Sequence, residues 1–441
     1  MNMLGYYLEL AMRSMKRSRG LTVLMVFAIG FGVAASMTTY SVFRAVSGDP
    51  IPWKSSRLFV PQIDAWGPST QRDGDNEPVN ALSYIDAMAL MRDHRAKLQS
   101  AMYIIWSSVV PTRQGGHPFN VSGHAVYSEF FPLVEAPFKY GSAWSADDDR
   151  QRSAVAVISS KLNTKLFGGE NSVGKTVNVE GRNYRVVGVL DAWNPQPVFY
   201  DVQNTGGFST AADDLFLPFD RAIESGVPND GNTNCTKPPK DPGFVGLLRS
   251  SCVWISYLAQ LDDAQAVSAY RGYLENYAHE QQKAGRFNWA PNIRLRDLPA
   301  WLESQEVVPS DTKVSLLVAV GLLVVCLVNT SGLLLAKFLR RSGEIGVRRA
   351  LGASRFAIYA QFLTEAGMIG LSGGVLGLAF TGFGVLGVGM VLPKGIAKLA
   401  TLDMPLLFLT LALAVFSTLV AGLYPTFRAS RVQPAWQLKS N

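Results

Sequence analysis

The sequence contains few cysteines and few charged residues for its length. Three cysteines among 441 residues exclude a disulfide-dense scaffold, and a hydrophobic content of 48% excludes a disordered chain. Charged residues make up 17% of the chain, against about 25% in ordinary soluble domains. The 41 Lys and Arg outnumber the 34 Asp and Glu, so the net charge is +7. That total alone fits a nucleic-acid binder, a membrane-surface protein or a membrane protein.

The missing charge is concentrated in four runs that contain no Asp, Glu, Lys or Arg: 21–43, 314–336, 366–393 and 404–427. Each run exceeds the roughly 20 residues with which a helix crosses a bilayer. The sequence therefore predicts transmembrane helices at 21–43, 314–336, 357–392 and 404–427. The alternative for the first run is a cleaved signal peptide, but its 23 residues are too long for such a segment and no A-x-A-like site follows. We interpret it as a retained anchor.

The short flanking segments predict the orientation. Thirteen Lys and Arg fall in three segments, 1–20, 337–356 and 428–441, which places these segments in the cytoplasm by the positive-inside rule. The region 44–313 and the loop 393–403 then lie outside. The external region has 26 Lys and Arg against 30 Asp and Glu, so no basic patch for nucleic acid remains to be explained.

The external region has mixed α and β patterning. Helical spacing predicts helices, and runs of Val, Ile and aromatic residues predict strands. The predicted helices are 83–99 and 262–282, and the predicted strands are 101–110, 154–159, 176–180, 184–190, 252–261 and 292–298. The predicted fold class is thus a membrane protein with four transmembrane helices, one plus three, and a large mixed α+β extracytoplasmic domain between helices one and two.

Two cysteines, Cys235 and Cys252, fall in the external region, whereas Cys326 lies inside the second membrane helix. An external compartment is oxidising, so we expect a disulfide between Cys235 and Cys252. The alternative is two free thiols.

No catalytic motif stands out in the chain. The stretch 169–176 matches the P-loop pattern, but a helix is predicted before it and a strand after it, which is the reverse of a nucleotide-binding loop. The four histidines have no metal-ligand spacing and are interpreted as surface residues: His94, His117, His124 and His279. We expect no catalytic, cofactor-binding or metal-binding residue in this chain.

Three motifs carry a family resemblance. EIGVRRALGAS with QFLTEAGMIGLSGGVLGL (344–378) and GLYPTFRASRVQPAWQLK (422–439) resemble the permease signatures of MacB-like and FtsX-like ABC transporters. VAVISSKLNTKLFGGENSVGKTVNVEGRNYRVVGVL (155–190) resembles the MacB periplasmic core pattern. The chain is identified as resembling a MacB-like/FtsX-like permease with its termini in the cytoplasm of a bacterial cell and its helices in the inner membrane.

The resemblance implies a dimeric permease, homodimer or heterodimer, driven by an ABC ATPase that holds ATP and Mg. Because only 1–20 precedes the first membrane helix, we expect the ATPase on a separate chain. A coupling helix would be seated on it, through Glu344, Ile345, Arg348, Arg349 and Leu351. The residues themselves also allow a basic interfacial linker held by anionic lipid. Small residues would let the membrane helices approach closely, namely Gly30, Gly32, Gly370, Gly373, Gly374 and Gly377.

Three functions follow as expectations. The first is efflux of a substrate through a periplasmic adaptor and an outer-membrane duct. The second is mechanotransmission, in which the permease controls a periplasmic enzyme or sensor. The third is extraction of lipoproteins from the membrane.

Overall fold

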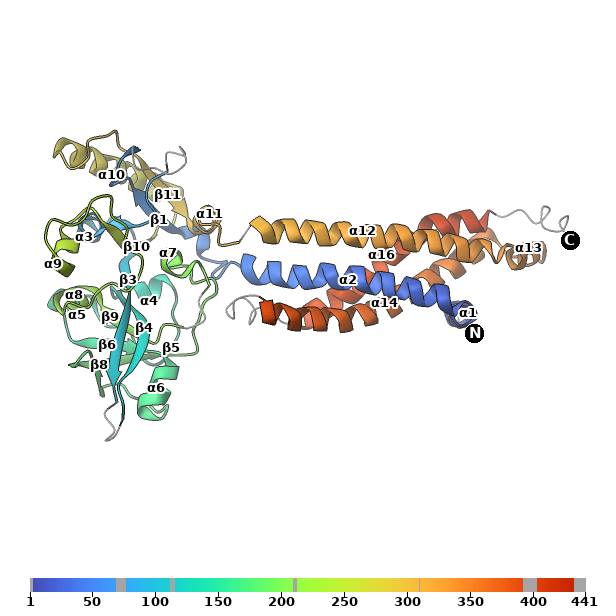
Figure 1. Cartoon of the computed structure of the whole chain (residues 1–441), viewed down its shortest axis with the longest axis horizontal. Helices are drawn as coiled ribbons and strands as arrows, with labels where there is room; N and C mark the ends of the chain where they lie inside the picture. Colours follow the sequence, from blue (N-terminus) through green and yellow to red (C-terminus); the bar gives the residue numbers. More distant parts are fainter. Residues whose placement is uncertain are drawn as a thin grey trace. The chain divides into compact units, whose positions relative to one another are not determined.

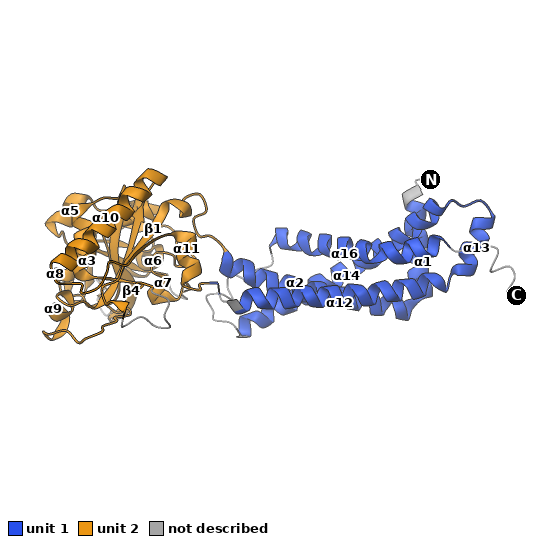
Figure 2. Cartoon of the chain, turned by 90° about the horizontal axis from the view of Figure 1, so that it is seen from above, with its two compact units in different colours: residues 1–47, 308–441 blue, residues 48–307 orange. Residues whose placement is uncertain are grey.

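The computed structural model describes residues 3–68, 77–111, 116–208, 212–308, 310–391 and 403–431. The chain divides into two compact units, one formed by residues 1–47 and 308–441 and the other by residues 48–307 (Figure 2). All of the predicted loop 393–403 except Asp403, and most of the predicted tail 428–441, lie outside the described residues. We call residues 1–47 and 308–441 the helix unit, and residues 48–307 the sheet unit.

Within its described residues, the helix unit contains four helices that are long and apolar enough to cross a membrane. These helices run side by side along the unit, and α1 and α13 lie at the same end of it (Figure 1). Buried Met25, Ile29, Val33, Phe362 and Ile369 contribute to a common core between them. The helices of this unit are α1 (Met3–Arg17), α2 (Arg19–Ser47), α12 (Ser310–Leu339), α13 (Ser342–Ala350), α14 (Arg355–Val391) and α16 (Met404–Ser430).

The sheet unit is built on one sheet in the order β11-β1-β10-β3-β4-β9-β6-β8-β5, with β2 paired to β10 and β7 paired to β3 and β8. The pairs β4–β9 and β6–β8 are parallel. The strands are β1 (Leu58–Ile63), β2 (Leu82–Ser83), β3 (Leu98–Val110), β4 (Phe119–Val126), β5 (Phe138–Gly141), β6 (Val155–Ile158), β7 (Thr176–Val179), β8 (Arg182–Leu190), β9 (Leu215–Pro218), β10 (Val253–Gln260) and β11 (Ile293–Asp297).

Helices cover both faces of this sheet because its strands are apolar on both sides. In β6, Ala156 and Ile158 belong to one buried cluster, whereas Val155 and Val157 belong to another, as the two-residue period of a strand requires. α3 and α10 pack on the first face and α4 and α11 on the second. The helices of the unit are α3 (Tyr84–Asp93), α4 (Phe130–Leu133), α5 (Ala146–Gln151), α6 (Ser160–Phe167), α7 (Val202–Thr205), α8 (Phe219–Glu224), α9 (Gly243–Leu248), α10 (Ala264–Lys283) and α11 (Leu298–Ser304), with a 3-10 turn η1 (Ser55–Arg57).

The predicted fold class, one membrane helix, a mixed α and β domain and three further membrane helices, is confirmed. One predicted helix is too long, because 83–99 divides into α3 and the start of β3. His94 ends α3 in the left-handed conformation, with φ of 42°, so the residues after it leave the helix.

Candidate functional site

The short helix α13 lies between two membrane-length helices. Its end is set by Gly352, whose φ of 99° is a left-handed conformation that favours glycine. The N–H groups of Gly352 and Ala353 donate to the carbonyls of Arg349 and Arg348. Ser354 Oγ then accepts from the N–H of Ala357 at 3.1 Å and caps the start of α14. The sequence Gly-Ala-Ser therefore ends α13 and begins α14.

A buried carboxylate joins α14 to its neighbours at this end of the helix unit. The side chain of Glu365 has no exposed surface, and its Oε1 lies 2.7 Å from Lys337 Nζ at the end of α12. Its Oε2 lies 3.1 Å from a guanidinium nitrogen of Arg341. The hydroxyl of Ser14, in α1, donates to Oε1. Glu365 thus has the ion pairs that a charge buried between membrane helices requires.

The charges continue from Glu365 into α13. Arg341 also pairs with Glu344 at 3.0 Å, and Glu344 pairs with Arg348 at 2.9 Å. Arg348 in turn donates to Gln361 of α14 at 2.9 Å. The hydrogen bond from Arg341, with the nearby Arg348 charge, holds the pKa of Glu344 below its usual value. We call Lys337, Glu365, Arg341, Glu344 and Arg348 the ion chain, and it fixes α13 against α12 and α14.

The outer face of α13 and the turn after it are apolar and exposed. Val347 is 57% exposed, Leu351 is 83% exposed and Phe356, at the start of α14, is 78% exposed. Two exposed arginines lie near them in sequence: Arg340 before Val347, and Arg355 between Leu351 and Phe356. An exposed apolar patch bordered by charge is typical of a protein or membrane contact. We call Val347, Leu351 and Phe356 the α13 patch.

The five predicted coupling residues therefore have different surroundings. Glu344 and Arg348 belong to the ion chain, Arg349 donates to the carbonyl of Ser430 at 3.4 Å, and Ile345 is buried. Leu351 alone among them lies in the α13 patch. The sequence alone did not predict a role for four residues at this site: Ser14, Lys337, Arg341 and Glu365. A signal existed, because Lys337 directly follows one charge-free run and Glu365 directly precedes the next.

The six glycines proposed for helix packing lie at contacts between helices. A Cβ on Gly30 would come within 3.1 Å of the Gly373 carbonyl oxygen, and one on Gly373 would come within 2.8 Å of Ile29. A Cβ on Gly377 would meet Gly30, and a Cβ on Gly32 would come within 3.1 Å of Cys326 in α12. Gly370 and Gly374 face Thr418 and Ala414 of α16. Side chains at these positions would separate α2, α12, α14 and α16.

A second ionic cluster lies within the sheet unit. His124 of β4 is buried, with Nε2 2.8 Å from Asp201 and Nδ1 2.9 Å from Asp213. Burial alone would lower the pKa of His124, but the two carboxylates outweigh it and raise the pKa to about 10. The prediction that His124 is a surface residue is therefore wrong, because β4 is an inner strand and the ring has two carboxylate partners.

The remaining sequence motifs have structural roles. Cys235 and Cys252 are joined by a disulfide, and the adjacent Asn234 and Val253 form an isolated bridge between their backbones. The P-loop-like stretch ends in a turn that opens β7 rather than a helix, so it offers no helix N-terminus for phosphate. In the part of the chain that the structure describes, no group of three His, Cys, Asp or Glu side chains could hold a metal ion.

Comparison with known proteins identifies both units. The family model of the MacB-like periplasmic core domain matches residues 22–277, and that of the FtsX-like permease C-terminal matches residues 316–434. The chain is 24% identical over 440 residues to the pyoverdine export ATP-binding/permease protein PvdT of Pseudomonas aeruginosa, covering 98% of this chain and 58% of PvdT. It is 24% identical over 439 residues to the macrolide export ATP-binding/permease protein MacB of Hyphomonas neptunium, covering 98% of this chain and 60% of MacB.

A solved structure, the periplasmic region of MacB from Actinobacillus actinomycetemcomitans, aligns with 58% of this chain and 95% of its own at 15% identity, with a TM-score of 0.36. The chain spans 58% and 60% of the two exporters named above, and 45% of PvdT from Pseudomonas syringae, to which it is 26% identical over 74% of its own length.

Proposed function

This chain belongs to the MacB-like and FtsX-like permeases of ABC transporters, and we propose that it couples ATP hydrolysis by an ABC ATPase to export of a substrate. The α13 patch is the observation that carries this proposal, because it offers apolar contact area beside a helix that the ion chain holds rigidly. A docked ATPase that moves α13 would also move α12 and α14 through Glu365. We expect the ATPase on a separate chain, with ATP and Mg bound there.

The connections of the chain support a mechanical route to the sheet unit. α2 ends at Ser47 and the sheet unit begins at residue 48; the sheet unit ends at residue 307 and α12 begins at Ser310. Short connections of this kind transmit the displacement of a helix better than long flexible ones do. We propose that a dimer of this permease, with itself or with a second permease, works in the inner membrane in this way.

Export is favoured over the alternatives by the relatives, whose names describe export of pyoverdine and of macrolides. We propose that the substrate leaves the periplasm through an adaptor and an outer-membrane duct. Control of a periplasmic enzyme or sensor and extraction of lipoproteins remain the competing functions. A strain lacking this chain that accumulates no exported compound, but loses activity of a periplasmic enzyme, would favour mechanotransmission.

The test targets the α13 patch. We expect Val347→Asp with Leu351→Asp to weaken co-purification of the ATPase by roughly tenfold or more, since charges would replace the apolar centre of the contact. Val245→Asp is the matched control, because Val245 is 55% exposed in the sheet unit. Wild-type ATPase binding and wild-type ATP turnover in the double variant would contradict the docking site. Nanodisc reconstitution and size-exclusion chromatography verify that both variants are folded.

A further inference from the structure

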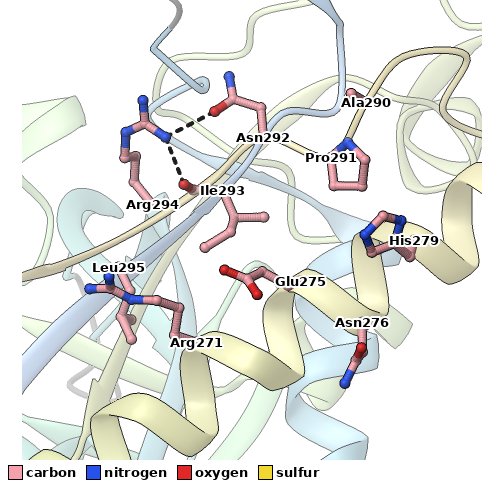
Figure 3. Close-up of a pocket in the computed structure, with 10 residues that line it drawn as sticks. All are labelled: Arg271, Glu275, Asn276, His279, Ala290, Pro291, Asn292, Ile293, Arg294 and Leu295. Carbon is pink, nitrogen blue, oxygen red and sulfur yellow. Dashed lines mark hydrogen bonds between the residues drawn. The ribbon is translucent and has the colours of Figure 1, made fainter.

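The sheet ends in an open strand edge that faces a groove. β11 pairs with β1 and with no other described strand. Beside it lies a groove of 730 Å³ between β11 and α10, lined by residues of both elements (Figure 3). In Figure 3, Glu275 points from α10 toward Ile293 of β11, and His279 lies one turn further along the same helix. Natural proteins usually cover or interrupt such an edge.

The register shows which backbone groups face the groove. The N–H of Asp64 donates to the carbonyl of Asn292, and the N–H of Leu261 donates to the carbonyl of Arg57 on the other side of β1. Because successive residues direct their backbone groups to opposite sides of a strand, Arg294 and Arg296 bond to β1. Leu295, between them, directs its N–H and C=O away from β1, toward the open edge.

The face of β11 that carries Arg294 and Arg296 has a net positive charge. Arg294 and Arg296 lie on one face of β11 and share a single carboxylate, that of Glu77, at 3.8 Å and 2.6 Å. The guanidinium of Arg294 also donates to the Ile293 carbonyl at 2.9 Å. On the groove wall, Arg271 and Glu275 of α10 carry opposite charges, so this wall adds no net charge. On the face of Arg294 and Arg296, an added strand would therefore meet two guanidinium groups and a single carboxylate.

This charge pattern argues against a second copy of the same edge. If two β11 strands paired antiparallel about Leu295, Arg294 of each would stand directly opposite Arg296 of the other. Like charges in directly opposed positions destabilise a strand pair. The complementary strand instead carries acidic residues at two positions separated by one residue. Two acidic residues separated by one residue form the same pattern in both chain directions. The pattern therefore fits a strand added either parallel or antiparallel to β11.

We propose that the β11 edge binds an extended segment of a partner protein as an added strand, with the pattern acidic-x-acidic opposite Arg294 and Arg296. The backbone of Leu295 would exchange hydrogen bonds with the central residue x. The two acidic side chains would pair with the two arginines, and the side chain of x would face α10. Backbone bonds give such a contact its affinity and the alternate side chains give it specificity.

The test uses the full chain in nanodiscs and the fluorescein-labelled peptide TEVET-amide, measured by fluorescence anisotropy. We expect saturable binding, weakened roughly fivefold or more when the central valine is N-methylated, because that change removes the central N–H and adds bulk at the edge. The peptide TKVKT-amide should bind roughly tenfold more weakly or not at all. Equal binding of the N-methylated and unmodified peptides would overturn the strand addition.

Variants of the protein provide the reciprocal test. Arg294→Glu with Arg296→Glu should lose TEVET-amide and gain TKVKT-amide, which a merely unfolded protein could not do. Arg249→Glu is the control, since Arg249 forms an exposed ion pair with Asp241 elsewhere in the sheet unit. An unchanged preference for TEVET-amide in the double variant would overturn the proposal. Dissociation of a dimer of this chain by TEVET-amide, measured by mass photometry, would also overturn the proposal. The β11 edge would then bind a second copy of this chain and not a partner protein.

Discussion

The buried charge of Glu365 links α12, α14 and α1 in the helix unit through its pairs with Lys337 and Arg341 and its hydrogen bond from Ser14. We expect Glu365→Gln to lower the free energy of unfolding by about 3 kcal/mol, because Lys337 and Arg341 would lose their shared buried carboxylate. Lys337 would be affected more, since Arg341 keeps Glu344 as a partner. The measurement is the unfolding temperature of the purified chain in detergent.

Two further variants distinguish loss of charge pairing from loss of packing. Glu365→Gln combined with Lys337→Met removes the stranded ammonium and should recover part of the lost stability. Glu9→Gln should change stability by less than about 0.5 kcal/mol, because its pair with Arg13 is exposed. If the double variant were no more stable than Glu365→Gln alone, the lost ion pair with Lys337 would not be the cause of the destabilisation.

His124 makes the stability of the sheet unit depend on pH. Its pKa is raised from 6.5 to about 10 in the folded protein, so the stabilisation it provides is complete below pH 6.5 and is lost as pH rises toward 10. We expect His124→Gln to be strongly destabilised at pH 6, since Asp201 and Asp213 lose their cation. The difference from the wild type should shrink steadily between pH 7 and 10.

Urea unfolding of both proteins at several pH values, followed by tryptophan fluorescence, checks this pH dependence. His94→Gln is the control, because His94 is half exposed and paired only with Glu129. A destabilisation by His124→Gln that stayed constant from pH 6 to pH 10 would show that the cluster acts through shape rather than through the charge of the imidazolium.

At the scale of secondary structure elements, the close approach of α2 and α14 is sensitive to side-chain size. We expect Gly373→Val to lower the unfolding temperature by several degrees, because the new Cβ would lie 2.8 Å from Ile29 and force the two helices apart. Gly389→Val, in the same helix, is the matched control, since a Cβ there meets nothing within 4 Å. Equal effects of the two variants would rule out helix separation as the cause.

The elements most accurately predicted from sequence were those with a strong local pattern. The membrane helices followed from absent charge, and α10 and β10 followed from their spacing within two residues of the observed ends. β1 and β4 were not predicted. The proline in β1 and the glycine and histidine in β4 weaken the local signal, and pairing and burial within the sheet stabilise these strands. Lys337, Arg341 and Glu365 of the ion chain were missed for a related reason, because Lys337 and Glu365 meet only when α12 and α14 pack.

At the scale of the whole molecule, the net charge of +7 is the sum of two unlike parts. The region 44–313 contributes −4, from 26 Lys and Arg against 30 Asp and Glu. The structure gathers the positive residues of α1, α13 and the adjoining helix ends at one end of the helix unit. Arg44 and Asp403 instead pair with each other at 2.9 Å, so the excess positive charge belongs to the α13 end.

This asymmetry predicts the orientation in the membrane. Moving the positive end across a bilayer is opposed during insertion, so α13 should face the cytoplasm and the sheet unit the periplasm. With Cys326→Ala as the parent, we expect Lys283→Cys to react with a membrane-impermeant maleimide on intact spheroplasts. Ser354→Cys, in the turn after α13, should react only after permeabilisation. The reverse labelling pattern would place the α13 patch outside the cell and would contradict both the orientation and the coupling role proposed for α13.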